Sequence, residues 1–427
     1  MKNSIAFVVY YLKQNRYSFN ALVGALETVQ SLNNLEVFFL KSKQELFNNL
    51  KIIINKHQKI ILGISFFSTQ IWEIRELISI LRENYGKKII YIAGGPHPTG
   101  DPKGTLKMGF DVVILGEGEE TLIELLKKLN KGDLYDDVKG LAYLNDKGKY
   151  NYTGKRNLID LDKYPPFPVR YNKFGAIEIT RGCPFLCYFC QTPYILGIHP
   201  RHRSIESICN YIRIMKEKNL TDIRFISPNA FSYGSKDGKT LNFEKLEKLL
   251  QSIKEIIKPK GRIFLGSFPS EVRPEHVSKE TIDLIKKYCS NDNIIIGAQS
   301  GSQKILDSCN RGHKVEDVYH AVELTLNSKL KANVDFIFGL PGETHEDIDL
   351  TIFMVKKLSK MGARIHTHFF LPLPQTPFAK QKVDRIDNKF KKVIDKLTSS
   401  GNAFGEWKSQ EKLAIKLSKY LKSGNFD

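Results

Sequence analysis

The chain has 427 residues, 41% of them hydrophobic, which is enough for two or three domains with buried cores. Its formal net charge of +19 raises the question of a nucleic-acid partner, but the lysines are scattered among acidic residues along helical patterns, so we favour an ordinary solvated surface. No apolar run approaches the ~20 residues of a membrane helix, and no signal-peptide pattern opens the chain, so we expect a cytoplasmic location and no membrane span.

Residues 1–130 predict a parallel, doubly wound α/β domain of the Rossmann-like type. Short apolar runs alternate there with helix-length amphipathic segments. The expected strands are Ile5–Tyr10, Glu36–Leu40, Ile60–Phe66, Ile89–Ile92 and Val112–Leu115. Strands that alternate with helices favour βαβ units, whose ligands bind at the carboxyl ends of the strands.

Residues 131–169 form a polar stretch that we interpret as a small hairpin followed by a linker. Asp146-Lys147-Gly148 is a typical tight-turn sequence, and Pro165-Pro166-Phe167-Pro168 is stiff and extended. This stretch is the expected boundary between two domains.

Residues 170–378 predict a partial (βα)6 barrel. The expected strands are Ala176–Thr180, Asp222–Ser227, Arg262–Phe268, Asn293–Gln299, Asn333–Gly339 and Arg364–Leu371. In barrels of this kind the active site lies at the carboxyl ends of the strands. The remaining residues, 379–427, are rich in lysine and predict a short helical C-terminal extension.

Three cysteines, Cys183, Cys187 and Cys190, follow the first expected barrel strand within eight residues. Three thiolates on one loop can hold three irons of a [4Fe–4S] cluster and leave the fourth iron open for a substrate. A zinc site would show two close cysteine pairs, and a thioredoxin-type site a single pair. The other three cysteines, Cys209, Cys289 and Cys309, lie far apart and are typical of core thiols.

The Cys-x-x-x-Cys-x-aromatic-Cys loop resembles the signature of the radical S-adenosylmethionine (SAM) enzymes. The resemblance implies that Cys183, Cys187 and Cys190 bind the cluster and that the open iron chelates the amino and carboxylate groups of SAM. The reduced cluster of that family cleaves SAM to methionine and a 5′-deoxyadenosyl radical. The same resemblance places Phe189 against the adenine.

Further SAM contacts are expected from the loops after the second and third strands. The family places polar atoms against the methionine end of SAM where Asn229 lies here, although an ordinary turn asparagine is the alternative. Ser267, Glu271 and Arg273 follow the third strand. The carboxylate suits ribose hydroxyls and the guanidinium suits a carboxylate, but the two side chains could equally form a surface ion pair.

The fourth and fifth strands end in segments that also resemble the family. Gln299 and Ser300 are expected to hydrogen-bond the ribose, and Gly339 and Pro341 belong to a Gly-Leu-Pro-Gly-Glu-Thr turn beside the adenine. His366 and His368 share one face of the last strand. They either line the substrate cavity or pack in the core.

The N-terminal domain resembles the cobalamin-binding domain that precedes many radical SAM barrels. Its strand-end loops imply cobalamin contacts at Ser65, Ser68, Gly94, Gly95, His97, Gly116, Glu117 and Gly118. One departure is that residues 11–17 lack the Asp-x-His-x-x-Gly motif whose histidine is the lower cobalt ligand in many such domains. Either cobalamin binds without that histidine, or the domain has kept its fold and lost its cofactor.

These observations predict a radical SAM enzyme with a [4Fe–4S] cluster, SAM and cobalamin as cofactors, and a methyltransferase acting on an unactivated carbon as the leading hypothesis. The alternatives are a tRNA methylthiotransferase-like or other radical enzyme without functional cobalamin, and a non-catalytic cluster or cobalamin sensor. Methylthiotransferases carry three further N-terminal cysteines, whereas the first cysteine here is Cys183. A reductant such as ferredoxin or flavodoxin is the expected partner, and the cluster fits an anaerobic interior.

Overall fold

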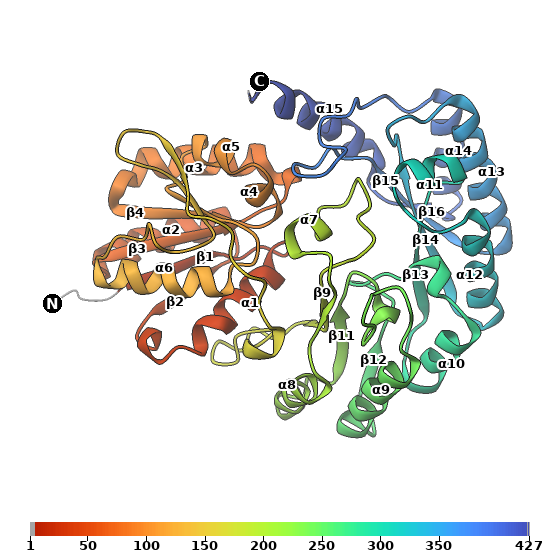
Figure 1. The fold of residues 1–427 in the computed structure, drawn as a ribbon, viewed down its shortest axis with the longest axis horizontal. Helices are drawn as coiled ribbons and strands as arrows, with labels where there is room; N and C mark the ends of the chain where they lie inside the picture. The colour runs from red at the N-terminus through yellow and green to blue at the C-terminus, as the bar shows by residue number, and fades with distance from the viewer. Residues whose placement is uncertain (1–4, 425, 427) are drawn as a thin grey trace. The chain divides into compact units, whose positions relative to one another are not determined.

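A computed structural model describes residues 5–424 and 426 of the chain. The chain divides into two compact units, one ending at Gly175 and the other beginning at Ala176 (Figure 1). Among the described residues, no helix is both long enough and apolar enough to cross a membrane.

The first unit is built on a seven-stranded sheet of order β2-β1-β3-β4-β5-β6-β7. The parallel strands are β1 (Ile5–Tyr10), β2 (Glu36–Leu40), β3 (Lys59–Ser65), β4 (Ile89–Gly94) and β5 (Val112–Ile114). Its helices are α1 (Arg16–Glu27), α2 (Lys43–Lys56), α3 (Ile71–Tyr85), α4 (Pro96–Gly100), α5 (Pro102–Lys107) and α6 (Glu119–Lys131). Every residue of β1 is buried, as expected for a central strand with helices on both faces.

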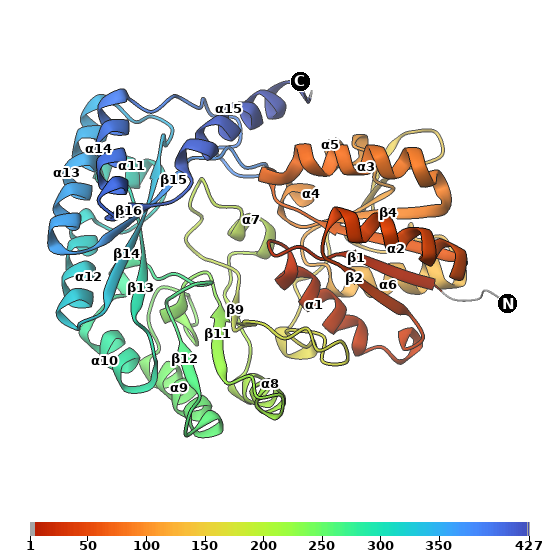
Figure 2. The ribbon, with the colours of Figure 1, turned by 180° about the vertical axis from the view of Figure 1, so that it is seen from behind.

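Helices cover both faces of this sheet. Figures 1 and 2 show α1 and α6 on one face, with α2 and α3 on the other. On the first face, Phe19 and Val23 of α1 share a core cluster with Leu122 and Leu126 of α6. The predicted doubly wound domain is thereby confirmed.

The hairpin expected between the domains is part of the first unit's sheet. Its strands β6 (Leu141–Leu144) and β7 (Tyr150–Tyr152) extend the sheet in antiparallel fashion from β5. The backbone groups at the edge of β5 would otherwise lack ladder partners, and the hairpin supplies them.

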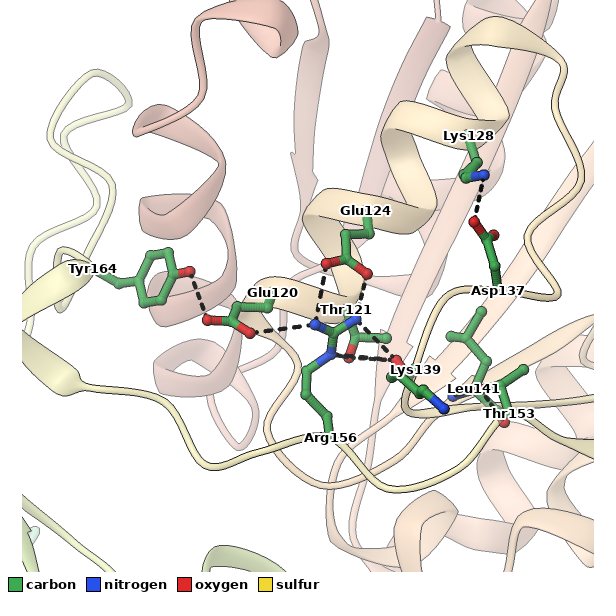
Figure 3. Close-up of polar contacts among 10 residues, drawn as sticks. All are labelled: Glu120, Thr121, Glu124, Lys128, Asp137, Lys139, Leu141, Thr153, Arg156 and Tyr164. Carbon is green, nitrogen blue, oxygen red and sulfur yellow. Dashed lines mark hydrogen bonds and ion pairs between the residues drawn. The ribbon is translucent and has the colours of Figure 1, made fainter.

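The segment after the hairpin is tied to α6 by a cluster of polar contacts around Arg156 (Figure 3). The Arg156 guanidinium donates to Glu124 Oε1 at 3.1 Å, to Glu120 Oε2 at 3.3 Å and to Thr121 Oγ1 at 3.0 Å. Tyr164 donates its hydroxyl to the other oxygen of Glu120 at 3.3 Å. The Arg156 side chain is only 13% exposed, so these ion pairs are screened less than surface pairs.

We expect the Arg156→Ala variant to unfold more easily than the wild type, by about 1–3 kcal/mol, because the hydrogen bonds of the largely buried guanidinium to Glu120, Glu124 and Thr121 are lost. Thermal unfolding followed by circular dichroism would measure the change. The matched control is Lys128→Ala. Lys128 is on α6, like Glu120 and Glu124, but its ion pair with Asp137 is exposed, so its loss should leave the melting temperature unchanged. Equal effects of the two variants would contradict the assigned role of Arg156.

The second unit is an open arc of parallel strands with helices outside it (Figures 1 and 2). Its barrel strands are β8 (Ile177–Glu178), β11 (Asp222–Ile226), β12 (Arg262–Phe264), β13 (Asn293–Gln299), β14 (Lys331–Phe338), β15 (Arg364–Phe369) and β16 (Ala403–Phe404). The pairings run β12-β11-β8 and β13-β14-β15-β16, and a parallel bridge between Val272 and Ile296 joins the two groups. The predicted partial barrel is confirmed.

The helices of this unit lie between its strands, except for α15, which follows the last strand, β16. They are α7 (Thr192–Leu196), α8 (Ile205–Glu217), α9 (Phe243–Ile257), α10 (Lys279–Tyr288), α11 (Gln303–Ser308), α12 (Val315–Asn327), α13 (His345–Met361), α14 (Asn388–Ser399) and α15 (Trp407–Ser423). A short antiparallel pair, β9 (Thr180–Arg181) with β10 (Arg201–His202), lies next to the cysteine loop.

The C-terminal extension is helical as expected but also contributes β16, which pairs in parallel with β15. Ile365 donates its N–H to the Asn402 carbonyl at 2.8 Å as part of this pairing. A strand of two residues has no detectable period, so only its partner's open edge reveals it.

Candidate functional site

The cysteine loop follows β9 at the carboxyl end of the first barrel strand. Gly182 enters it with φ +90°, and a Cβ at this position would overlap the carbonyl oxygen of His199. Cys183 donates its N–H to Gly197 at 3.0 Å, and Cys190 donates its N–H to Cys187 at 3.1 Å. These backbone bonds set the shape of the loop independently of any bound group.

All three loop cysteines are free thiols. Cys187 is buried, whereas Cys183 and Cys190 are half-buried. A zinc ion bound at about 2.3 Å would draw its sulfur ligands to within about 4 Å of one another. In the part of the chain that the structure describes, no group of three metal-ligating atoms within 4.8 Å includes a cysteine.

A buried arginine lies against the cysteine loop. Arg311, just after α11, donates to Cys187 Sγ at 3.7 Å and to the Gly297 carbonyl at 2.8 Å. Arg311 is only 6% exposed. The SAM contacts expected from the sequence do not include it; the only signal was its place in the segment Arg311-Gly312-His313 after the fourth strand.

The thiols and the neighbouring guanidinium suit a negatively charged, thiolate-bound cluster. Burial raises the pKa of the Cys183 thiol and raises that of Cys190 to about 11, so the bare thiols remain protonated. Iron would displace these protons, and the guanidinium of Arg311 can donate a hydrogen bond to the resulting thiolate. The three cysteines and this arginine are thus a donor set that fits a [4Fe–4S] cluster.

The predicted contacts after the second and third strands gather in one buried network. Asn229 Nδ2 lies 2.5 Å from His276 Nδ1, and its Oδ1 accepts the N–H of Arg273 at 3.3 Å. The Arg273 guanidinium lies 3.5 Å from the centroid of the Phe185 ring, within the cysteine loop, and is ion-paired with Glu275. Asn229 and Arg273 are therefore interior residues beside the loop rather than surface residues.

Two other predicted residues from this region carry polar atoms into the interior. Ser267 Oγ is buried without a hydrogen-bond partner. Glu271 shares a hydrogen bond with Asp335, and burial, followed by the charge of Asp335, raises its pKa. A buried hydroxyl without a partner and a carboxyl whose pKa is raised by burial are groups that a polar ligand can satisfy.

The fourth strand ends in an irregularity. The register of β13 shifts between Gly297 and Gln299, and Gln299 has φ +73°, which is uncommon for a residue with a side chain. Ser300, by contrast, is fully buried and lies 3.4 Å from Thr351 Oγ1 of α13, so its hydroxyl is directed toward that helix. A β-bulge beside an active site commonly re-aims a side chain, and here that side chain is Gln299.

The Gly-Leu-Pro-Gly-Glu-Thr turn follows β14. Gly339 has φ +71°, and a Cβ there would approach the Phe369 ring to 2.6 Å. Pro341 is half-buried in the same turn. A pocket of about 440 Å³ opens here, lined by Gly339, Leu340, Glu343 and residues 384–387 among others. Phe189 is not among the lining residues, but it packs against the core cluster that includes Leu340 and Phe370.

In the N-terminal unit the predicted contacts lie at the carboxyl ends of β3, β4 and β5. A Cβ at Gly94 would meet no atom within 4 Å, whereas at Gly95, with φ +95°, it would lie 2.6 Å from Ser65 Oγ. Gly116 has φ +71° and donates its N–H to Thr99 Oγ1 at 3.1 Å. The open space at Gly94 is a cradle that side chains would fill, and it fits a cofactor lying over the strand ends.

The remaining predicted contacts of this unit are engaged within the fold. His97 is fully buried; its Nδ1 lies 2.9 Å from Ser68 Oγ, and burial lowers its pKa to about 4. Glu117 accepts the N–H of Ile159 at 2.8 Å. Gly118 precedes α6, and a Cβ there would lie 2.9 Å from a methyl carbon of Leu22. These residues stabilise the strand-end loops through contacts inside the unit.

The side chain of Asn15 holds the loop after β1 in place through hydrogen bonds to the backbone. Asn15 Nδ2 donates to the carbonyls of Tyr10 and Ser65 at 3.0 and 2.9 Å, and its Oδ1 accepts the N–H of Leu12 at 2.9 Å. α1 begins at the next residue, Arg16. The Asn15 side chain thus ties the loop after β1 to the carboxyl end of β3.

The fold and the cysteine loop define a class of protein: a two-unit α/β enzyme with a strand-end cofactor cradle and an open barrel that holds an iron–sulfur cluster. Residues 177–355 match the radical SAM superfamily, and residues 27–126 match the B12 binding domain. The chain belongs to the radical SAM superfamily, among the members that carry a B12-binding domain. Its cofactors are those of the two domains, a [4Fe–4S] cluster with SAM, and cobalamin.

Known proteins resemble the chain over both units. It is 28% identical to an uncharacterized methyltransferase of Pyrococcus horikoshii, over 73% of this chain and 67% of that protein. It is 29% identical to the tRNA-2-methylthio-N(6)-dimethylallyladenosine synthase of Petrotoga mobilis, over 65% of this chain but only 63% of that protein.

Among solved structures, the radical SAM methyltransferase TsrM from Kitasatospora setae, with cobalamin and a [4Fe–4S] cluster bound, has the same fold. The TM-score is 0.68 at 16% identity, and the match covers 89% of this chain and 74% of TsrM.

Proposed function

We propose that the protein is a cobalamin-dependent radical SAM methyltransferase acting on an unactivated carbon. The observation that carries the proposal is that one chain holds both the three-cysteine loop and a B12-binding domain with an open strand-end cradle at Gly94. When bound, the cluster supplies the electron that cleaves SAM, and cobalamin supplies a carrier for the methyl group.

The chain's own residues have distinct parts in this proposal. Cys183, Cys187 and Cys190 hold the cluster, and Arg311 hydrogen-bonds one of its thiolates. Gln299, re-aimed by the bulge in β13, and the turn containing Gly339 bind SAM. No protein base is needed, because hydrogen abstraction by a carbon radical requires positioning and exclusion of water rather than proton transfer.

The proposal also includes the reductant and the location of the protein. A ferredoxin- or flavodoxin-type reductant and a cytoplasmic location suit a low-potential cluster. The similarity to a methylthio-tRNA synthase favours methylthio transfer as the second candidate. Against it, no cysteine precedes Cys183, so the N-terminal unit has no thiolate set for a second cluster.

The test begins with anaerobic purification and reconstitution of the cluster. The protein is incubated with cobalamin, reductant and SAM labelled with deuterium in its methyl group, while the visible spectrum and the nucleoside products are followed. We expect bound corrinoid and both 5′-deoxyadenosine and S-adenosylhomocysteine. Deoxyadenosine alone, without bound corrinoid, would refute the methyltransferase and indicate radical chemistry of another kind.

We expect Gly94→Val to abolish corrinoid binding without loss of stability. Gly94 does not have a positive φ, and a Cβ added there would meet no atom within 4 Å. A valine therefore fits the strand, and its side chain fills the cradle. Corrinoid content after reconstitution, measured beside the melting temperature, checks this. The control Ser79→Val places the same side chain on an exposed position of α3 and should retain corrinoid. Normal corrinoid content in Gly94→Val would place the cofactor elsewhere.

A further inference from the structure

Two histidines and an aspartate converge on neighbouring strands of the barrel. Asp335 of β14 pairs with His366 of β15 in the strand register, and His368 lies two residues further along the same face. Among the described residues, these three form the one group of His, Cys, Asp or Glu ligand atoms that all lie within 4.8 Å of one another. They lie outside the cysteine loop and belong to no proposed SAM contact.

The distances within this group match those between ligands on one face of a metal ion. His366 Nδ1 lies 2.9 Å from Asp335 Oδ1 and 3.1 Å from His368 Nε2, and His368 Nε2 lies 3.9 Å from Asp335 Oδ2. Adjacent ligands placed about 2.1 Å from an ion are separated by about 3.0 Å in an octahedron and about 3.4 Å in a tetrahedron. Little movement is needed for the three atoms to share one ion.

The surroundings provide both support and an open side. His366 stacks on Phe404 of β16, with ring centroids 4.5 Å apart and an interplanar angle of 9°. The two histidine side chains are still 30% and 32% exposed, so positions opposite the protein ligands are accessible.

The group also faces the interior side of the arc. Ile365, Thr367 and Phe369 alternate with the histidines on β15 and are buried, as residues beneath covering helices are. A buried polar series continues from the histidines through Asp335, Glu271 and Arg311 to Cys187. The three side chains therefore lie on the same side of the strands as the cysteine loop.

We propose that Asp335, His366 and His368 bind one divalent transition-metal ion, separate from the cluster, whose open positions accept an oxygen or nitrogen atom of a ligand in the barrel. Two imidazoles and one carboxylate with open positions suit Fe²⁺, Mn²⁺ or Zn²⁺ rather than Ca²⁺, which prefers oxygen ligands only. The proposal does not depend on methyl transfer. The competing arrangement is a metal-free group in which a proton on His366 is shared with its two neighbours.

Manganese is the most suitable probe because Mn²⁺ binds oxygen and imidazole but has little affinity for thiols. The full-length chain with its reconstituted, oxidised cluster is titrated with MnCl2, and the free ion is counted by its electron paramagnetic resonance signal. We expect one bound Mn²⁺ per chain. Pulsed measurements on the bound ion should detect coupling to two imidazole nitrogens, a signature that needs no variant.

The variants His366→Ala and His368→Ala should each weaken Mn²⁺ binding at least tenfold, and Asp335→Asn should do the same. The control His320→Ala removes an exposed histidine of α12 and should bind as the wild type does. Absence of stoichiometric binding at millimolar Mn²⁺, unchanged binding in His366→Ala, or bound Mn²⁺ without nitrogen coupling would overturn the proposal and leave the proton-sharing group. None of these readouts uses SAM cleavage or methyl transfer, so the proposed function can fail separately.

Discussion

Replacement of Cys183, Cys187 or Cys190 by alanine is expected to reduce the formation of 5′-deoxyadenosine from SAM to the background level. Each cysteine supplies one of three iron ligands, and a cluster held by two thiolates is labile and lacks a defined open iron. The backbone–backbone hydrogen bonds of the loop, from Cys183 N–H to the Gly197 carbonyl and from Cys190 N–H to the Cys187 carbonyl, remain in each variant, so each should still fold. Iron and sulfide content, the visible absorbance of the cluster and the nucleoside product are measured together.

The matched control for these variants is Cys289→Ala. Cys289 ends α10, away from the loop, and is half-buried like Cys183 and Cys190. It should retain the iron content and the rate of the wild type, which separates loss of a cluster ligand from loss of a thiol. A loop variant that kept both would exclude that cysteine as a ligand.

The second large effect is expected at Arg311, which donates to Cys187 Sγ. In Arg311→Met the cluster should still assemble, but its reduction potential should be about 50–100 mV more negative, equivalent to about 1–2 kcal/mol. Reduction adds negative charge to the cluster, and the guanidinium stabilises the more negative state. We expect SAM cleavage under a fixed reductant to slow by about tenfold. Redox titration followed by electron paramagnetic resonance measures the potential.

Two further variants isolate the role of Arg311. Arg311→Lys keeps the charge without the planar guanidinium, so most of the potential should be recovered even if the bond to the Gly297 carbonyl is lost. Arg213→Met removes an exposed arginine of α8 and should change neither potential nor rate. An unaltered potential in Arg311→Met, with the protein folded, would show that the residue only packs against the loop.

Much of the architecture was predictable because it depends on local pattern. The runs Ile5–Tyr10 and Asn293–Gln299 were predicted as strands with the bounds that the structure has, since buried parallel strands are continuous apolar segments between turns. Strand β16 was missed, and the hairpin β6–β7 was predicted as a feature of the linker rather than of the sheet. In both cases the strand forms because it pairs with the open edge of a strand elsewhere in the chain, β15 for β16 and β5 for β6.

The SAM and cobalamin contacts that the sequence suggested remain predictions, but the structure separates them by environment. Gln299 has φ +73° at the bulge in β13, while Ser300 beside it lies against Thr351. Gly94 leaves open space, and His97 three residues later is fully buried. Residues close together in the sequence differ in this way because backbone dihedrals and packing, which no spacing rule specifies, set the directions of their side chains.

The sequence by itself determined the order of the domains and the three-cysteine loop, because strand periodicity and the spacing of ligands on one loop are properties of short segments. Only the tertiary structure placed Arg311 on the sulfur of Cys187, 124 residues away, and brought Asp335 of one strand beside His366 and His368 of the next. Contacts of this range depend on strand register and on how far the barrel curves. Those are set by the packing of the whole sheet against its helices rather than by any local pattern.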